Sequence, residues 1–591
     1  MKIQGITTKV TKWVIGILPF YLITLLPLNT VAQGVANVTV DSVGKLATKI
    51  AESDRFKIYE LKVSGPLNGT DLKLIQQIVN RSKAKEKDGE CLVTTVDLSG
   101  ATITEGKEGL KTQANTLPDG MFKGAKGLTT AVLPKNIGTI SKDCFANCEK
   151  LTTITIPETV TVIENEAFQD CESLTAINIP GNVLTIESEA FENCKSLAAI
   201  EIPANVREVG KQAFRNCPKL VTANVLGNLK KIADDTFRGC ESLVNLTLPE
   251  SITSIGDNAF QGCLRLPTVL LPENVVELGT SAFQGCKSLA GINLNKVRNV
   301  GISAFEDCAS LQELAFEQIA KMGVSAFRNC GSLTTVKLDG NLSTISTNAF
   351  IGCTKLNNIT IPSTVQVIDG SAFYACRSLT AIELPVGLTK IGSHAFEQCS
   401  SLQKISVPNL VKSIGSSAFQ DCTALQKAII GGIILEVESD LFRGCAQLDS
   451  ISLPSTVRKI GSKAFQKCAM LRSIDLPMAL TEIGNDAFEQ CAALREVKIP
   501  TAVQVIGSDA FAECLLLSKV ELSTGLRKIG GSAFSKCPSL RDVILNSPAP
   551  PAISKSTFKG VVANFWVPKG CAMLYAASKD WVKIAVREKQ Q

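Results

Sequence analysis

The sequence predicts a solenoid of about twenty stacked coils that share one parallel β-sheet and one core. Two observations lead to this prediction. A phenylalanine, usually preceded by alanine, recurs twenty times between Phe122 and Phe558, at steps of 23 residues apart from two steps of 22 and a last one of 24. Each unit also carries a Leu-x-x-Ile-x-Ile segment, and this alternation is typical of a strand with one buried face.

The elements of one coil follow from its residues in order. Leu174 and Ile177 belong to a strand pattern that should end at Pro180, because proline has no amide hydrogen to donate to a sheet. Twelve coils carry proline at this position. A second apolar pair follows, such as Val160 and Ile163 in the preceding coil, and then a turn that glycine often marks, where a positive φ would cost glycine little. The Ala-Phe-x-x-Cys-x-x-Leu stretch should return the chain to the next strand through turns or short helical segments.

Both ends of such a stack expose core and unpaired strand edge, so each end needs a cap. We expect an α/β cap at the N-terminus, with an amphipathic helix over residues 70–80 that turns Leu72, Ile75 and Val79 toward the stack. Thr70 or Asp71 could cap that helix. The predicted division of the chain is a signal peptide at 1–32, an N-terminal cap at 33–116, the solenoid at 117–560 and a C-terminal cap at 561–591.

The first residues have the features of a secretion signal. Three lysines precede an apolar run from Trp13 to Leu28, and the small residues around Ala32 suit cleavage before Gln33. An uncleaved membrane anchor is the alternative, but the run is only 16 residues long and contains two prolines, whereas a span needs about 20 residues. We therefore expect a secreted or outer-surface protein that has no transmembrane span once the signal is removed.

The charge balance argues against nucleic acid as a partner. The formal net charge is +6, and removal of the three N-terminal lysines leaves 58 basic against 55 acidic residues. This balance is too small for a protein dedicated to nucleic acids or anionic membranes.

Cysteines form a second periodic series. Eighteen of the 21 cysteines, from Cys148 to Cys537, stand three residues after the repeated phenylalanine. We interpret them as buried, reduced thiols that act as small apolar residues. Disulfides are the alternative, but equivalent side chains on parallel coils point the same way, and disulfide geometry is demanding. Cys91, Cys144 and Cys571 lie outside the series, and no cysteine or histidine cluster predicts a metal site.

Few residues could support catalysis. His394 is the only histidine, so mechanisms that need a histidine base beside a nucleophile have a single candidate, which we interpret as a solvated turn residue. Paired carboxylates could still hydrolyse glycans, but Tyr374 is the only Tyr or Trp among the coils, which argues against sugar recognition. The sequence predicts no enzyme activity and no cofactor.

The outward face of the predicted sheet changes along the chain. Its early coils present small neutral residues such as Thr153 and Ala176, whereas its late coils present charges of both signs. These charges could recognise a protein partner, since charges of both signs favour one register of the partner along the sheet. Alternatively, they could simply keep the surface soluble. The candidate partner-binding residues, which we call the charged strip, are Arg472, Asp475, Arg495, Glu496, Lys498, Lys519, Glu521 and Arg541.

The repeating unit resembles that of the BspA-like leucine-rich repeat family, which occurs in surface and secreted proteins of Bacteroides-type bacteria. The motif is Leu-x-x-Ile-x-Ile-Pro followed by Val-x-x-Ile-Gly-x-x-Ala-Phe-x-x-Cys, and the resemblance extends from Phe122 to Phe558. It implies a leucine-rich-repeat solenoid that mediates adhesion or protein binding, with host extracellular matrix among the candidate partners. It implies no shared active site. The alternative function is a structural spacer of the cell envelope without a dedicated ligand.

Overall fold

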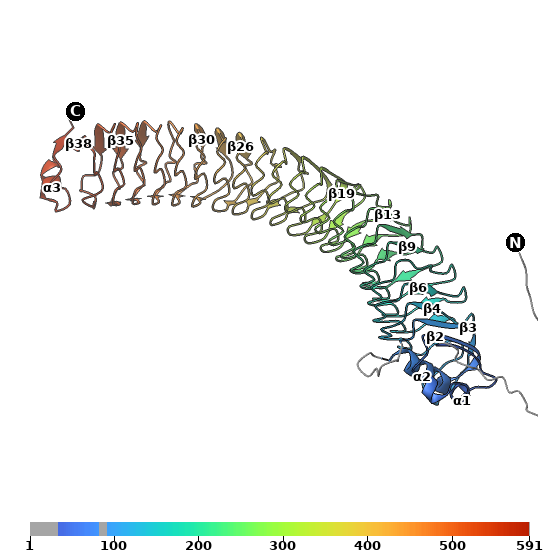
Figure 1. Cartoon of the computed structure of the whole chain (residues 1–591). Helices are drawn as coiled ribbons and strands as arrows, with labels where there is room; N and C mark the ends of the chain where they lie inside the picture. Colours follow the sequence, from blue (N-terminus) through green and yellow to red (C-terminus); the bar gives the residue numbers. More distant parts are fainter. Residues whose placement is uncertain (1–33, 82–91, 590–591) are drawn as a thin grey trace, which may run out of the picture.

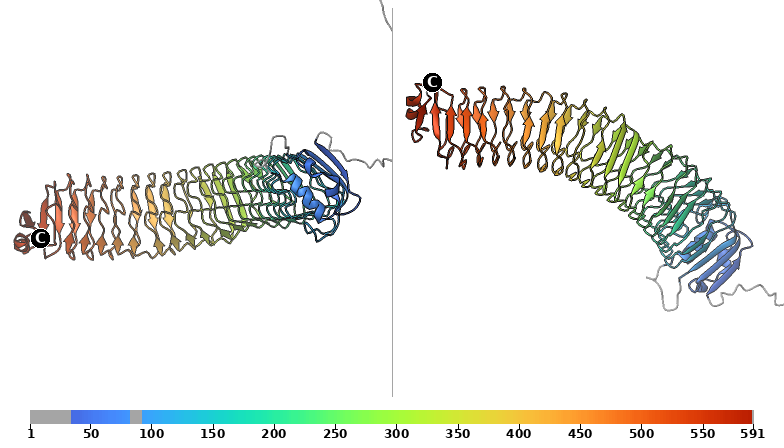
Figure 2. Two further views of the ribbon diagram at one scale, coloured as in Figure 1. Left: turned by 60° about the horizontal axis from the view of Figure 1, so that its bottom comes forward. Right: turned by 90° about the horizontal axis from the view of Figure 1, so that it is seen from above.

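The chain forms a single arc of stacked coils in a computed structural model, which describes residues 34–81 and 92–589. Figure 1 shows a cap with two helices at the N-terminal end and the short helix α3 at the other end. The N-terminal half bends, while the part from β26 to β38 is nearly straight (Figures 1 and 2). The predicted solenoid is confirmed, and the predicted signal peptide at 1–32 lies outside the described residues.

The coils form two ladders of parallel strands, and most coils contribute a strand to both. The first ladder contains the predicted Leu-x-x-Ile-x-Ile strands and continues into the C-terminal cap. The repeat strands are β4 Thr130–Val132, β6 Thr153–Thr155, β9 Ala199–Ile202, β11 Thr222–Val225, β13 Asn245–Thr247, β15 Thr268–Val269, β17 Gly291–Ile292, β19 Glu313–Ile319, β21 Thr335–Gly340, β23 Asn358–Thr360, β26 Lys404–Val407, β28 Lys427–Ile430, β30 Ser450–Ser452, β33 Glu496–Lys498, β35 Lys519–Leu522 and β37 Asp542–Leu545, and the cap strands are β38 Asn564–Val567 and β39 Val586–Glu588. Residues 174–180, 379–385 and 471–477 occupy the same place in their coils without forming a strand.

The second ladder is built from the second apolar pair of each coil. Its strands are two residues long: β5 Thr139–Ile140, β7 Val162–Ile163, β8 Thr185–Ile186, β10 Glu208–Val209, β12 Lys231–Ile232, β14 Ser254–Ile255, β16 Glu277–Leu278, β18 Asn299–Val300, β20 Lys321–Met322, β22 Thr344–Ile345, β24 Val367–Ile368, β25 Lys390–Ile391, β27 Ser413–Ile414, β29 Glu436–Val437, β31 Lys459–Ile460, β32 Glu482–Ile483, β34 Val505–Ile506 and β36 Lys528–Ile529. Between residues 117 and 560, all of them described, the rest of each coil consists of turns rather than helical segments.

The phenylalanines form one continuous column inside the arc. Neighbouring ring centroids lie between 5.0 and 5.6 Å apart, and the angle between neighbouring ring planes is 22° for the first pair and at most 11° for the others. The side chains from Phe122 to Phe534 are fully buried. Offset-stacked rings at this spacing attract one another in addition to the free energy gained from their burial. The column therefore links every coil to the next and forms the shared core that the repeat predicted.

The turn glycines have a different role from the one expected. Gly392 and its equivalents do not have positive φ, but a Cβ at Gly392 would lie 2.4 Å from the backbone nitrogen of Gly370 in the preceding coil. Glycine is needed there because the two backbones approach closely. Positive φ occurs instead two residues before the phenylalanine, as at Asn348 (59°) and His394 (59°), and often again two residues after it.

The two 22-residue coils keep the pairing of the second ladder. Glu277 pairs with Asn299, and Asn299 with Lys321, so the missing residue is absorbed elsewhere in each coil. In the first of these coils a turn follows β17, whereas in the second β19 continues through the position that proline usually occupies. Glu317 stands there and permits a strand of seven residues.

The N-terminal cap pairs three further strands with the first coils. They are β1 (Val35–Thr39), β2 (Glu60–Leu67) and β3 (Thr95–Ile103), accompanied by the helices α1 (Leu46–Lys49) and α2 (Gly69–Val79) and the 3-10 turn η1 (Glu52–Asp54). As predicted, α2 buries Leu72, Ile75 and Val79. Its N-cap, however, is Asn68 rather than Thr70 or Asp71, because the Asn68 side chain accepts the amide hydrogens of both those residues.

Asp71 stabilises the N-terminal cap by accepting hydrogen bonds from three backbone amides. Its carboxylate accepts from Gly44 at 2.7 Å, from Leu46 at 2.9 Å and from Asn68 at 3.2 Å. We expect Asp71→Ala to lower the free energy of unfolding of the cap by about 2 kcal/mol, because buried donors lose their acceptor. Hydrogen exchange of the α2 amides would measure the loss. Equal protection in the variant and the parent chain would contradict this role.

The C-terminal cap closes the other end with two buried aromatic side chains. Tyr575, on α3 (Ala572–Ala577), donates its hydroxyl to the Ser547 carbonyl at 2.8 Å. The Trp581 indole donates to the Pro551 carbonyl at 2.7 Å. Strands β38 and β39 extend the first ladder beyond the last phenylalanine of the column, so the cap continues the sheet.

Candidate interaction surface

The charged strip lies on the outward side of the C-terminal end of the first ladder. In β33, β35 and β37, Glu496 pairs with Lys519 and Lys519 with Asp542, while Lys498 pairs with Glu521 in the parallel row. The residues between these rows, such as Val497, are buried, so the charged side chains point away from the core. Arg472 and Asp475 belong to the coil before β33, where no strand forms, and Arg495 and Arg541 directly precede β33 and β37.

Some charges of the strip are neutralised inside the molecule and others are not. Lys519 contacts Glu521 at 2.9 Å, and the hydrogen bond from this ammonium lowers the pKa of the Glu521 carboxyl. Arg472 lies 3.4 Å from Asp449. By contrast, Arg495, Glu496 and Lys498 are exposed and form no ion pair with any residue of the described chain. These three side chains are therefore available to a partner.

Two residues outside the predicted charged strip extend this surface into the cap. Trp566 on β38 and Arg587 on β39 occupy the outward row of Glu521, because Glu521 pairs with Ile544, Ile544 with Trp566 and Trp566 with Arg587. The Trp566 indole donates to the Asp542 carboxylate at 2.9 Å, which fixes its orientation. The alternation Asn-Phe-Trp-Val, which matches that of a repeat strand, could have revealed Trp566 from the sequence.

Two hollows adjoin the strip. One, of about 300 Å³, lies among Asp475, Met478, Lys498 and Asn546, and its walls come from four successive coils. The second, of about 650 Å³, is bordered by Ile544, Trp566 and Lys589. Lys589 donates to Asn546 between them. The surface therefore combines charged groups with apolar recesses that could receive side chains of a partner.

The cysteine series occupies the core and makes a recurrent hydrogen bond. Each of the eighteen thiols is buried, and each donates to the carbonyl of the phenylalanine one coil earlier, as Cys353 does to Phe327 at 3.2 Å. Burial raises the pKa of the Cys353 thiol from its ordinary value near 9 to about 12. The sequence predicted burial but not this donor role. Cys91 lies outside the described residues, and in the described part of the chain no group of cysteine, histidine or acidic side chains could hold a metal ion.

His394 lies in a turn, as predicted, with Nδ1 2.5 Å from the Glu397 carboxylate. Its side chain is about half exposed, and Glu397 also accepts from Gln420 at 3.2 Å. The histidine is held by neighbouring side chains on the turn surface.

A family model described as "BspA type Leucine rich repeat region (6 copies)" matches four overlapping stretches, residues 115–244, 212–331, 320–448 and 435–562. Together they cover the whole solenoid. The chain belongs to the BspA-type leucine-rich repeat family. Members of this family are typically protein-binding proteins of the cell surface or secreted proteins, and such solenoids are typically scaffolds rather than enzymes. Among the described residues, no helix has the length and apolar character needed to cross a bilayer.

Several solved structures are similar to this chain of the BspA-type family. A leucine-rich repeat protein from Bacteroides ovatus is 27% identical, with a TM-score of 0.46, over 70% of this chain and 92% of that protein. A leucine-rich repeat protein of T. pallidum is 33% identical, with a TM-score of 0.26, over 28% of this chain and 76% of the other. A leucine-rich cell surface protein from Faecalibacterium prausnitzii is 24% identical, with a TM-score of 0.29, over 63% and 87% respectively. No curated protein matches the sequence.

Proposed function

We propose that this BspA-type solenoid is a secreted or surface-exposed adhesion protein that binds a protein partner through the charged strip. The observation that carries the proposal is the set of three exposed, unpaired charges, Arg495, Glu496 and Lys498, at fixed positions along one short strand segment. A partner that supplies complementary charges would be held in one register, and like charges would be repelled.

The neighbouring recesses support a protein as the ligand. Protein interfaces typically combine a buried apolar or aromatic anchor with a polar rim. Trp566 and Met478 offer apolar surface within the hollows on either side of the central strands, and Met478 is 70% exposed. Glycan binding is less favoured, since Trp566 is the only Trp or Tyr on this outward face among the described strands.

Charge reversal tests the strip directly. We expect the triple variant Arg495→Glu, Glu496→Lys, Lys498→Glu to bind an extracellular matrix protein at least about tenfold more weakly than the parent chain, because both signs of charge are inverted at once. Surface plasmon resonance against a panel of purified matrix proteins would measure the affinity. Lys404→Glu is the matched control, since it changes the net charge by the same amount on the outward face of β26.

Two outcomes would contradict the proposal. If no panel protein binds the parent chain, the structural-spacer function gains support. If a matrix protein binds the parent chain and the triple variant equally well, another surface is responsible for binding. A matching circular dichroism melt would show that the variant remains folded.

A further inference from the structure

The phenylalanine column ends without a full partner at Phe558. One face of this ring stacks on Phe534 at 5.5 Å, as in the other coils. On the other side, Phe565 meets the ring edge-on at 4.9 Å and Trp581 lies tilted at 6.1 Å. Phe558 is only partly buried, whereas the earlier rings of the column are fully buried. Part of an aromatic surface therefore remains open at the end of the core.

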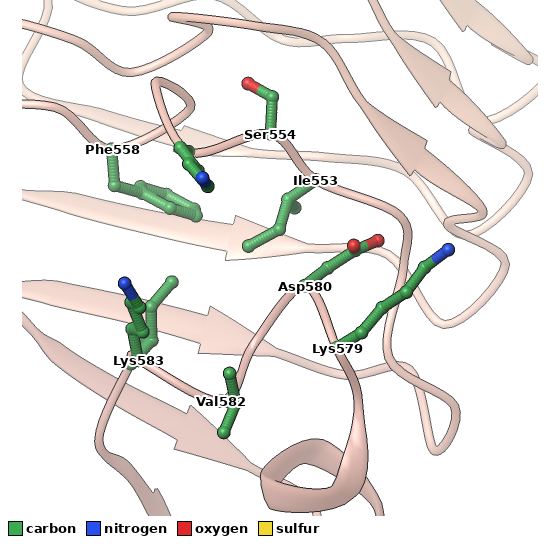
Figure 3. Close-up of a pocket in the computed structure, with 9 residues that line it drawn as sticks. Ile553, Ser554, Phe558, Lys579, Asp580, Val582 and Lys583 are labelled. Carbon is green, nitrogen blue, oxygen red and sulfur yellow. The ribbon is translucent and has the colours of Figure 1, made fainter.

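This open part of Phe558 faces a pocket of about 620 Å³ between the last coil and the cap segment 579–584. Ile553 and Ile584 supply further apolar lining, and Val582, which is 63% exposed, lies at the opening. Figure 3 shows Phe558 and Ile553 across the space from Val582. The volume is within the range typical of small-molecule sites.

The rim of the pocket is predominantly basic. Three lysines and one carboxylate line it: Lys555, Lys579, Lys583 and Asp580. None of the four takes part in an ion pair with the chain over residues 34–81 and 92–589. Lys579 and Asp580 are adjacent in sequence and offset each other in the net charge of the rim, so Lys555 and Lys583 supply the excess positive charge that would attract an anion.

We propose that this pocket binds a small aromatic carboxylate. Its ring would contact the uncovered part of Phe558 together with Ile553 and Val582, and its carboxylate would lie near the ammonium groups of Lys555 and Lys583. Aromatic rings attract one another in offset or edge-on contact, and lysine–carboxylate hydrogen bonds are stronger than neutral ones. A neutral aromatic compound would lose the charge attraction, and an aliphatic acid would lose the ring contact. The site is separate from the charged strip and does not depend on the proposed function.

Isothermal titration calorimetry with 2-naphthoate tests the site on the full chain. We expect saturable binding at one site, and the neutral analogue 2-naphthalenemethanol should bind about tenfold more weakly. The double variant Lys555→Glu, Lys583→Glu should lose about tenfold in affinity for 2-naphthoate while its affinity for the neutral analogue stays unchanged. Phe558→Leu keeps an apolar side chain but removes the ring, and it should lower the affinity for both compounds by about threefold.

The matched control is Lys559→Glu, Lys569→Glu, two exposed lysines that do not line the pocket. It should bind 2-naphthoate like the parent chain. The proposal fails if the parent chain does not bind 2-naphthoate, if both compounds bind equally well, or if the control loses as much affinity as the double variant. Near-ultraviolet circular dichroism of Trp581 and Tyr575 would show that each variant keeps the cap folded.

Discussion

Raising the pH from about 8 to about 10 is expected to unfold the solenoid cooperatively, because the buried thiols must remain protonated in the folded state. Burial raises the pKa of Cys240, Cys353 and Cys399 from an ordinary value near 9 to about 12. In the unfolded chain these thiols ionise near their ordinary value. Their contribution to stability is therefore complete below pH 9 and is lost progressively as the pH rises toward the folded pKa.

The size of this effect comes from repetition. The stabilisation of the folded state by each buried thiol falls by about 1.4 kcal/mol per pH unit in this window. Eighteen equivalent thiols lie along the column, so the losses add in every coil. A protein with a few buried thiols would barely respond to the same change in pH, whereas this chain should lose its far-ultraviolet circular dichroism signal.

The measurement follows thiolate absorbance at 240 nm and circular dichroism together, with a reductant present. Both signals should change in one transition above about pH 9 and should return when the pH is lowered. If thiolate absorbance rises fully while the circular dichroism signal stays constant, the thiols are not held in the neutral form by burial. If neither signal changes by about pH 11, ionisation of the thiols does not lower the free energy of unfolding enough to unfold the solenoid.

Phe350→Ala is expected to lower the free energy of unfolding by about 3–5 kcal/mol. The Phe350 ring is fully buried and stacks on Phe327 at 5.4 Å and on Phe373 at 5.5 Å. Truncation to alanine would leave a cavity in the middle of the column and remove two ring contacts. Denaturation by guanidinium chloride would measure the loss, with unfolding followed by circular dichroism.

Phe558→Ala serves as the control for position in the column. Phe558 is only partly buried and has one stacked neighbour, so its truncation should cost less than half as much as Phe350→Ala. Equal losses in the free energy of unfolding at the two positions would show that burial of the ring does not determine its contribution to stability. Because coils interact with their neighbours only, Phe350→Ala could also separate unfolding of the two halves into distinct transitions.

The architecture was predictable because every coil repeats the same pattern of buried residues. A 23-residue period with Phe, Cys and Leu at fixed places can be buried only if equivalent residues stack, and the structure places Phe350, Cys353 and Leu356 in the core accordingly. The start of α2 was assigned to the wrong residue because several neighbouring polar side chains could cap it. The role of Gly392 was missed because contacts between coils are not visible within one repeat.

The surface could be predicted only in part. Alternation of the strand residues identified which side chains point outward, and Arg495, Glu496 and Lys498 are indeed exposed. It did not reveal that Lys519 and Glu521 neutralise each other, since that contact depends on rotamers. Trp566 was assigned to the cap and was therefore overlooked as part of the sheet. The pocket beside Phe558 lies between the last coil and the cap segment 579–584, which carries no repeat, so no periodicity could indicate it.

The 22-residue coils show that a coil can lose a residue while its strands keep their neighbours. The same tolerance applies to whole units, because each cap contacts only the coils at its own end. Duplication or loss of a complete unit would therefore lengthen or shorten the molecule without altering either tip. The distance between an anchoring surface and the C-terminal tip would thus change in steps of one coil, whatever partner the tip binds.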